Sequence, residues 1–160
     1  MKLLFKQRLF SWFDSYDIFD ETGAVRYTVK GQLAWGHLLK IFDAAGQYAG
    51  TVRQKIFALL PTFLLYGSDG RGGEVRIGRV RKKLTFIGHK YSLDCNGWTV
   101  KGDVFGWDYT IADRRGKTVA VIGKELFRLT DTYTIEAAEK NILRALMVVL
   151  AIDAEKCSAR

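Results

Sequence analysis

Apolar and polar residues alternate in short runs along most of the chain, and each run ends at a turn signal. In runs such as 16–18, 39–41 and 109–111, every second side chain is apolar, which is typical of a strand with one buried face. Asp-x-x-Gly and a second alternating run follow. Because Asp accepts hydrogen bonds from nearby backbone N–H groups and Gly tolerates positive φ, this pattern predicts β-hairpins. It occurs at Asp20/Gly23, Asp43/Gly46, Asp69/Gly72, Asp94/Gly97 and Asp113/Gly116.

The five hairpins are joined by short connectors that each follow a bulky residue. These residues are Phe10, Leu33, Phe57, Leu84 and Phe127. Pro61, the only proline, lies in a connector, where its missing N–H costs least. With an N-terminal strand at 3–7 and a last strand at 132–136, the pattern predicts about twelve strands. All the connections are short enough for antiparallel pairing.

The segment 136–153 lacks this alternation and predicts a helix, with Glu136 and Glu139 in its first turn. From Ile142 onward it is apolar on every side, so we expect it to be buried on every side. Twelve antiparallel strands with one apolar face must close or stack. Together these features predict an all-β fold, a closed barrel of about twelve strands around a central hydrophobic helix.

Size and charge limit the classes of partner. The 160 residues, of which 48% are hydrophobic, suit a single domain spanning 1–160. Lys and Arg number 25 against 17 acidic residues, a formal charge of +8, which favours nucleic acid, acidic lipid or phosphorylated molecules as partners. The longest apolar run, 145–152, is far shorter than the ~20 residues that span a bilayer. No secretory signal is visible, and two cysteines suggest no disulfide framework, so we expect a cytoplasmic protein, at most peripheral at a membrane.

The densest charge lies in the segment 76–83. Val80, Leu84 and Phe86 share a parity that predicts an inward face, so Arg81 and Lys83 should point outward. A bulge at Gly78 and Arg79 would bring Arg76 to the same side. The candidate anion-binding or lipid-binding residues are Arg76, Arg79, Arg81, Lys83 and Lys90. The alternative is a solvated cationic strand that protects a sheet edge. Nucleic acid is disfavoured, because Val, Gly and Leu separate the cations where aromatic residues would be needed for stacking.

Catalytic chemistry finds little support in the sequence. His37 and His89 each follow a Gly in equivalent connectors and have no carboxylate nearby, so we interpret them as turn residues. Cys95 lacks a visible activating neighbour. Single Asp residues in the turns do not suit calcium, and the Gly-rich stretch 67–78 leads into no helix that could hold a phosphate. We predict no catalytic residue, no metal ligand and no cofactor.

Several stretches resemble the LURP-one-related family, whose bacterial members are YxjI-like proteins. They are "FSWFDSYDIFDETG", "AWGHLLKIFDAAGQYAGTVRQKIFALLPTF", "VKGDVFGWDYTIADRRGKTVAVIGKELFRLTDTYTIE" and "LRALMVVLAID". The most specific positions are Gly102-Asp103, Tyr109-Thr-Ile-x-Asp, Val119-Ala120-x-Ile122-x-Lys124 and Asp131-Thr-Tyr133. The family belongs with the tubby C-terminal domain and the phospholipid scramblases, and the resemblance implies a twelve-stranded barrel around a C-terminal helix. Tubby domains bind phosphoinositides through basic residues on the barrel surface, scramblases act at membranes, and plant relatives are linked to defence.

These observations lead to one functional hypothesis and two alternatives. We expect a non-catalytic binding module that associates peripherally with an anionic lipid headgroup or a phosphorylated partner through the basic strand. The first alternative is a regulatory or scaffold module that binds another protein. The second is an enzyme acting on a small phosphorylated or lipid substrate.

Overall fold

The structure is a computed structural model that describes residues 1–160 except 7–14, 33, 87, 89, 126–131 and 159–160. Twelve strands precede one helix, close to the predicted count. They are β1 (Lys2–Lys6), β2 (Ser15–Asp20), β3 (Val25–Gln32), β4 (Leu38–Asp43), β5 (Tyr48–Gln54), β6 (Thr62–Ser68), β7 (Glu74–Lys83), β8 (Lys90–Asp94), β9 (Thr99–Asp103), β10 (Asp108–Ala112), β11 (Thr118–Glu125) and β12 (Thr132–Ala137). The helix is α1 (Glu139–Ser158).

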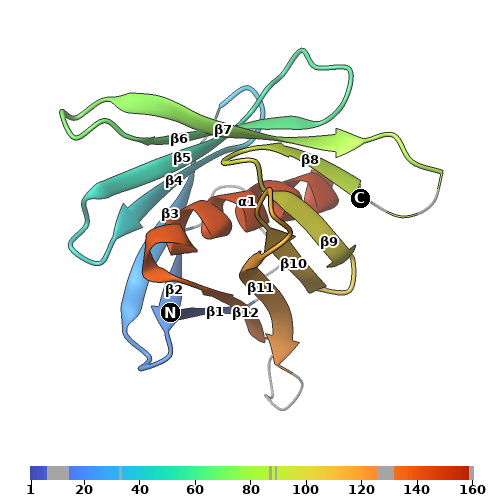
Figure 1. Ribbon diagram of the computed structural model, residues 1–160. Coiled ribbons are helices and arrows are strands. Elements are labelled where there is room, and N and C mark those ends of the chain that lie inside the picture. The colour runs from blue at the N-terminus through green and yellow to red at the C-terminus, as the bar shows by residue number, and fades with distance from the viewer. Residues whose placement is uncertain (7–14, 33, 87, 89, 126–131, 159–160) are drawn as a thin grey trace.

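The strands form one antiparallel sheet that wraps around α1 (Figure 1). Its order runs from β8 through β7 down to β1 and then through β12 to β9, because β1 pairs with β12 as well as with β2. Residues 90–103 are all described, and no ladder joins β8 to β9. The predicted barrel is therefore confirmed as nearly closed, with a seam between these two strands.

Four of the five Asp-x-x-Gly turns close in the same way. In the turn after β4, the Asp43 carboxylate accepts hydrogen bonds from the Ala45 and Gln47 N–H groups, both at 2.9 Å, and Gly46 has a φ of 78°. Asp20, Asp69 and Asp113 accept the equivalent pairs of backbone bonds. These turns are a local consequence of the sequence.

The fifth turn, after Asp94, does not continue into a hairpin. The Trp98 N–H donates to the Cys95 carbonyl at 2.9 Å, and Asn96 and Gly97 both have positive φ, as in a tight hairpin turn. Nevertheless β8 and β9 diverge, and Cys95 and Trp98 turn their side chains into the core. The prediction of a hairpin here was wrong, because the inward packing of this turn outweighs continued strand pairing.

The helix runs through the interior. Every residue from Ala145 to Glu155 is buried, which confirms the predicted axial helix. Its bounds differ from the predicted 136–153, because β12 continues to Ala137 and Glu136 pairs with Lys2 of β1 and Val121 of β11. At Gly50 of β5, an added Cβ would lie 3.0 Å from Met147 Cε, so the absence of a side chain there lets the helix pack against the sheet.

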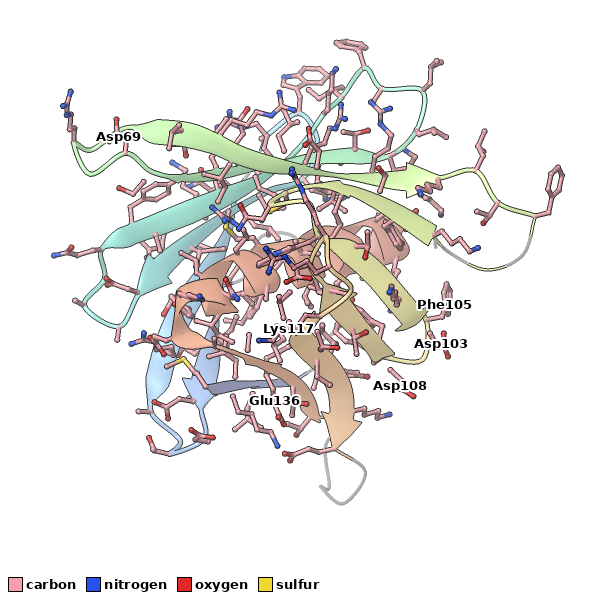
Figure 2. The ribbon with its side chains drawn as sticks, in the orientation of Figure 1. Asp69, Asp103, Phe105, Asp108, Lys117 and Glu136 are labelled. Atoms are coloured by element: carbon pink, nitrogen blue, oxygen red, sulfur yellow. The ribbon has the colours of Figure 1, made fainter. Side chains whose placement is uncertain are left out.

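The two ends of the barrel differ. We call the end with the turns after β2, β4, β6 and β10 the turn end, and the end with the β3–β4, β5–β6, β7–β8 and β9–β10 connections the connection end. Figure 2 labels Asp69 on a turn at the turn end and Phe105 in the β9–β10 connection. The helix starts at the turn end and finishes at the connection end, where Lys156 Nζ donates to the Val104 carbonyl at 3.0 Å.

Candidate anion-binding surface

The predicted cations occupy the outer face of β7 and β8. Val80 and Gly78 face the core, while Arg81 and Lys83 are exposed. Lys83 lies directly opposite Lys90 on β8, and Arg81 lies opposite Ser92. Residues opposite each other in an antiparallel pair share one face, so Arg81, Lys83 and Lys90 form a compact group, which we call the cation cluster. This cluster adjoins the connection end.

Two features distinguish the cation cluster. The direct opposition of Lys83 and Lys90 places like charges at neighbouring positions, an arrangement that disfavours the pairing slightly unless an anion is present. In addition, no ion pair to a carboxylate from the described part of the chain involves Arg81, Lys83 or Lys90. The cluster thus leaves several N–H donors available to an external anion.

The other two predicted cations lie apart from the cluster. Arg79 is 3.8 Å from an Asp94 carboxylate oxygen, so part of its charge is already compensated. Arg76 lies opposite Tyr66, whereas Arg81 lies opposite Thr62 four residues away on β6. At ~3.4 Å per residue, Arg76 is about 14 Å from Arg81 along the strand. The register shift that keeps both on the outer face occurs between Arg76 and Gly78, slightly before the predicted bulge.

A carboxylate network occupies the Arg76 half of this outer face. Glu74 accepts hydrogen bonds from Thr51 Oγ1 at 2.5 Å and from Tyr48 Oη at 2.7 Å, and Arg53 approaches it at 3.3 Å. The Thr51 hydrogen bond is the main cause that lowers the pKa of Glu74, while burial raises the pKa of Tyr48 to about 12. Glu74 therefore stays ionised at neutral pH and competes with external anions. The cation cluster at the other end of β7 is the better anion site.

One basic residue of β7 points inward. Lys82 shares the parity of Val80, and its Nζ lies 2.5 Å from Glu155 Oε1 on α1. Tyr91 Oη donates to the other oxygen of the same carboxylate. This network ties the end of the helix to β7 and β8 beside the seam. The parity of Lys82 in the sequence could have indicated that its side chain points inward, although its partner Glu155 lies 73 positions away.

The predicted inward face was wrong beyond Lys83. Leu84 and Phe86 were expected to continue the parity of Val80, but both are almost fully exposed. The physical reason is that β7 ends at Lys83, and a period of two has no meaning in the connection that follows.

The Gly-rich stretch 67–78 also shows that a strand can extend through glycines, since β6 and β7 leave only residues 69–73 as the turn.

The residues considered for catalysis lie in separate places. Burial lowers the pKa of His37, whose ring stacks on Phe63 with centroids 6.5 Å apart, and its backbone N–H donates to Gln54 Oε1. Burial raises the pKa of the Cys95 thiol, which disfavours the reactive thiolate. His89 lies outside the described residues. In the described part of the chain, no group of three His, Cys, Asp or Glu residues could hold a metal ion.

A cavity of about 290 Å³ lies near β1, β2 and the turn that follows β2. Its lining includes Phe5, Phe19, Asp20, Glu21 and Thr132. The Asp20 carboxylate is engaged by the Thr22 hydroxyl and by the Thr22 and Ala24 N–H groups, which lower its pKa. This carboxylate serves the turn and is a poor proton acceptor.

Known proteins with similar sequences or structures are consistent with this architecture. The model of the LURP-one-related family matches residues 1–153. This chain belongs to the LURP-one-related family. A relative from Bacillus subtilis (strain 168), the protein YxjI, is 25% identical over 155 residues, covering 96% of this chain and 92% of YxjI. The family resemblance seen in the sequence is thus confirmed.

The fold of this LURP-one-related chain also resembles a solved structure. The X-ray structure of an Arabidopsis thaliana protein, AT5G01750, superimposes with a TM-score of 0.59 at 14% identity, covering 93% of this chain and 88% of that one. Identity this low supports the shared fold alone. Within the described residues, no helix combines the length and apolarity needed to cross a bilayer.

Proposed function

We propose that this LURP-one-related protein is a binding module that attaches peripherally to anionic lipid, with the cation cluster as its contact. The observation that carries the proposal is the direct opposition of Lys83 and Lys90, with Arg81 beside them and no described carboxylate in an ion pair with any of the three. Ammonium and guanidinium groups form charge-assisted hydrogen bonds with phosphate oxygens. A phosphorylated molecule that is not a lipid shares this chemistry.

Each cation near an acidic bilayer contributes about 1 kcal/mol to binding. The variant Arg81→Gln/Lys83→Gln/Lys90→Gln should therefore bind vesicles of phosphatidylcholine and phosphatidylserine about a hundredfold more weakly in sedimentation assays. The matched control is Arg71→Gln/Arg115→Gln/Lys117→Gln, which removes the same charge from exposed positions at the turn end. Raising the salt concentration should weaken binding of the wild-type protein and have less effect on the cation-cluster variant.

Two further arms separate the sources of phosphate and test the proposal. Direct binding of free inositol phosphates by a protein that does not bind vesicles would assign the site to a soluble phosphorylated ligand. Equal binding to vesicles with and without phosphatidylserine would contradict the proposal, as would equal loss of binding in the two triple variants.

A protein partner is the second candidate, and the seam favours it. The free edges of β8 and β9 carry backbone groups that do not pair with each other, and such edges can accept a strand from another protein. Capture of one stoichiometric protein by the wild type, together with no binding to vesicles, would support this role. The prediction that the chain is not an enzyme stays a prediction.

A further inference from the structure

Five large apolar side chains are almost fully exposed on three connections at the connection end. They are Trp35 of the β3–β4 connection, Phe57 and Leu59 of the β5–β6 connection, and Leu84 and Phe86 of the β7–β8 connection, with exposed fractions of 84–110%. We call them the apolar tips. Single exposed apolar residues are common on proteins, but clusters of this kind mark interaction sites.

The three connections are neighbours and are held at their bases. The Gln54 N–H donates to the His37 carbonyl at 2.7 Å, and the His37 N–H donates back to Gln54 Oε1 at 3.0 Å, which joins the first connection to the second. The Lys82 N–H donates to the Pro61 carbonyl at 2.9 Å, which joins the second to the third. Figure 1 shows the β5–β6 connection projecting at the top and the β7–β8 connection at the right, both away from the β6–β7 turn at the left. The apolar tips therefore lie on neighbouring connections at one end of the barrel.

Cations lie at the bases of two of these connections. Lys55 is exposed at the start of the β5–β6 connection, and the cation cluster lies at the end of β7 and the start of β8. The apolar side chains lie at the tips of the connections, and the cations lie at the strand ends from which the connections project. This order matches the profile of an anionic bilayer. There the hydrocarbon accepts apolar side chains, and the phosphate layer above it attracts Lys and Arg.

We propose that the apolar tips insert into the interfacial region of an anionic bilayer, so that the barrel stands on the membrane with its connection end down. This inference rests on the proposed lipid function and adds the mode and orientation of binding. A second copy of the chain is a poorer occupant, because face-to-face contact would bring two cation clusters together. Single-stranded nucleic acid could stack on the three aromatic tips, but Leu59 and Leu84 offer no stacking surface.

Depth measurements test the insertion directly. A fluorophore sensitive to its environment is attached at Phe57→Cys in a Cys157→Ser background, where the remaining Cys95 is buried. With vesicles of phosphatidylcholine and phosphatidylserine that carry brominated acyl chains, we expect strong quenching and a blue shift of its emission. The matched control carries the label at Ala45→Cys, an exposed position in a turn-end turn, and should show neither effect.

Affinity measurements supply a second readout. Burial of one large apolar side chain corresponds to about a tenfold change in binding. The variant Phe57→Ser/Leu59→Ser should therefore partition into these vesicles at least about tenfold less, and the loss should persist at high salt. The control Val75→Ser/Val121→Ser alters two valines that are about half-exposed and lie in strands β7 and β11, and it should bind as the wild type does.

The outcomes separate this inference from the proposed function. Loss of binding in the cation-cluster variant, together with an unquenched label at position 57, would overturn insertion and leave surface attachment intact. No vesicle binding under any condition would overturn both proposals. Dimerisation that requires Phe57 and Leu59, or binding of single-stranded oligonucleotides that requires Phe57, would assign the apolar tips to those partners and overturn the inference.

Discussion

The turn end and the connection end of the barrel are joined by the same strands but reverse the chain in different ways. At the turn end, residues such as 21–24 and 44–47 reverse the chain, and an Asp carboxylate in each turn accepts the backbone N–H groups. At the connection end, the β3–β4, β5–β6 and β7–β8 connections carry the exposed apolar tips. A turn whose backbone N–H groups donate to its own Asp carboxylate needs no binding partner. An exposed apolar side chain, by contrast, is stabilised only when contact with another molecule removes it from water.

This difference implies that substitutions at the two ends should have opposite consequences. Changes at the turn end should lower the free energy of unfolding and leave binding unchanged. Changes to the apolar tips should weaken binding and leave stability unchanged. The four predictions below test this division and the helix that joins the ends.

The largest effect is expected from the helix that connects the two ends. Met147→Lys should prevent folding, because a charge at the fully buried Met147 has no partner within the core. The control Met147→Leu conserves volume and should cost less than about 1.5 kcal/mol. Circular dichroism with thermal melting provides the measurement. A cooperative transition in the Lys variant would contradict the axial helix on which the comparison depends.

The next largest effect is expected at the inner side of the connection end. Lys82→Met should lower the free energy of unfolding by about 3 kcal/mol, since it leaves the buried Glu155 carboxylate without its counter-ion. Lys82→Met/Glu155→Gln should recover most of this loss, because a neutral amide can still accept from Tyr91 Oη. Urea denaturation of the single and double variants measures the difference. Equal stabilities for the two would mean that the ion pair contributes nothing.

A smaller effect is expected from one turn. Asp43→Ala removes the acceptor for the Ala45 and Gln47 N–H groups and should lower the free energy of unfolding by about 1 kcal/mol. Asp43→Asn, which keeps an acceptor oxygen, should be closer to the wild type. By contrast, Phe57→Ser should change stability by less than about 0.5 kcal/mol, as for a surface substitution. Urea denaturation that shows the reverse order would contradict the division between the two ends.

The smallest effect is expected from acid. Backbone and side-chain hydrogen bonds within the turns lower the pKa of Asp20 and Asp69 below the ordinary value of 3.8. The folded state therefore holds these carboxylates ionised more strongly than the unfolded state does. Their contribution is present above the unfolded pKa and disappears as the pH falls through the folded pKa. NMR titration of the two carboxyl carbons should give midpoints below 3.8. Midpoints at or above this value would show that the turns do not stabilise the charge.

Much of the architecture could be predicted from the sequence, because its causes are local. Strand alternation, the Asp-x-x-Gly turns and the apolar helix each depend on residues a few positions apart, and the number of strands and the central helix followed from them. The outward direction of Arg81 and Lys83 followed from the same alternation. The sequence therefore identified the basic strand as the candidate site, but it did not show that the cations form a compact cluster.

The features that were missed depend on contacts between distant segments. The cation cluster requires Lys90 to lie opposite Lys83, which the register of β7 and β8 decides. The connections gave no periodic signal from which the exposure of Leu84 and Phe86 could be read. The diverging strands at the seam depend on how Cys95 and Trp98 pack into the core, which the tight turn between them does not specify.

The amino-acid sequence on its own settled where the chain extends, where it reverses and which segment is apolar enough for the interior. Only the tertiary structure settled that Lys82 turns toward Glu155, that three connections lie side by side, and that the two ends of the barrel expose different chemistry. The reason is physical. Backbone geometry and short-range hydrogen bonds act between near neighbours, whereas burial and charge pairing depend on which distant residues the closed sheet brings together.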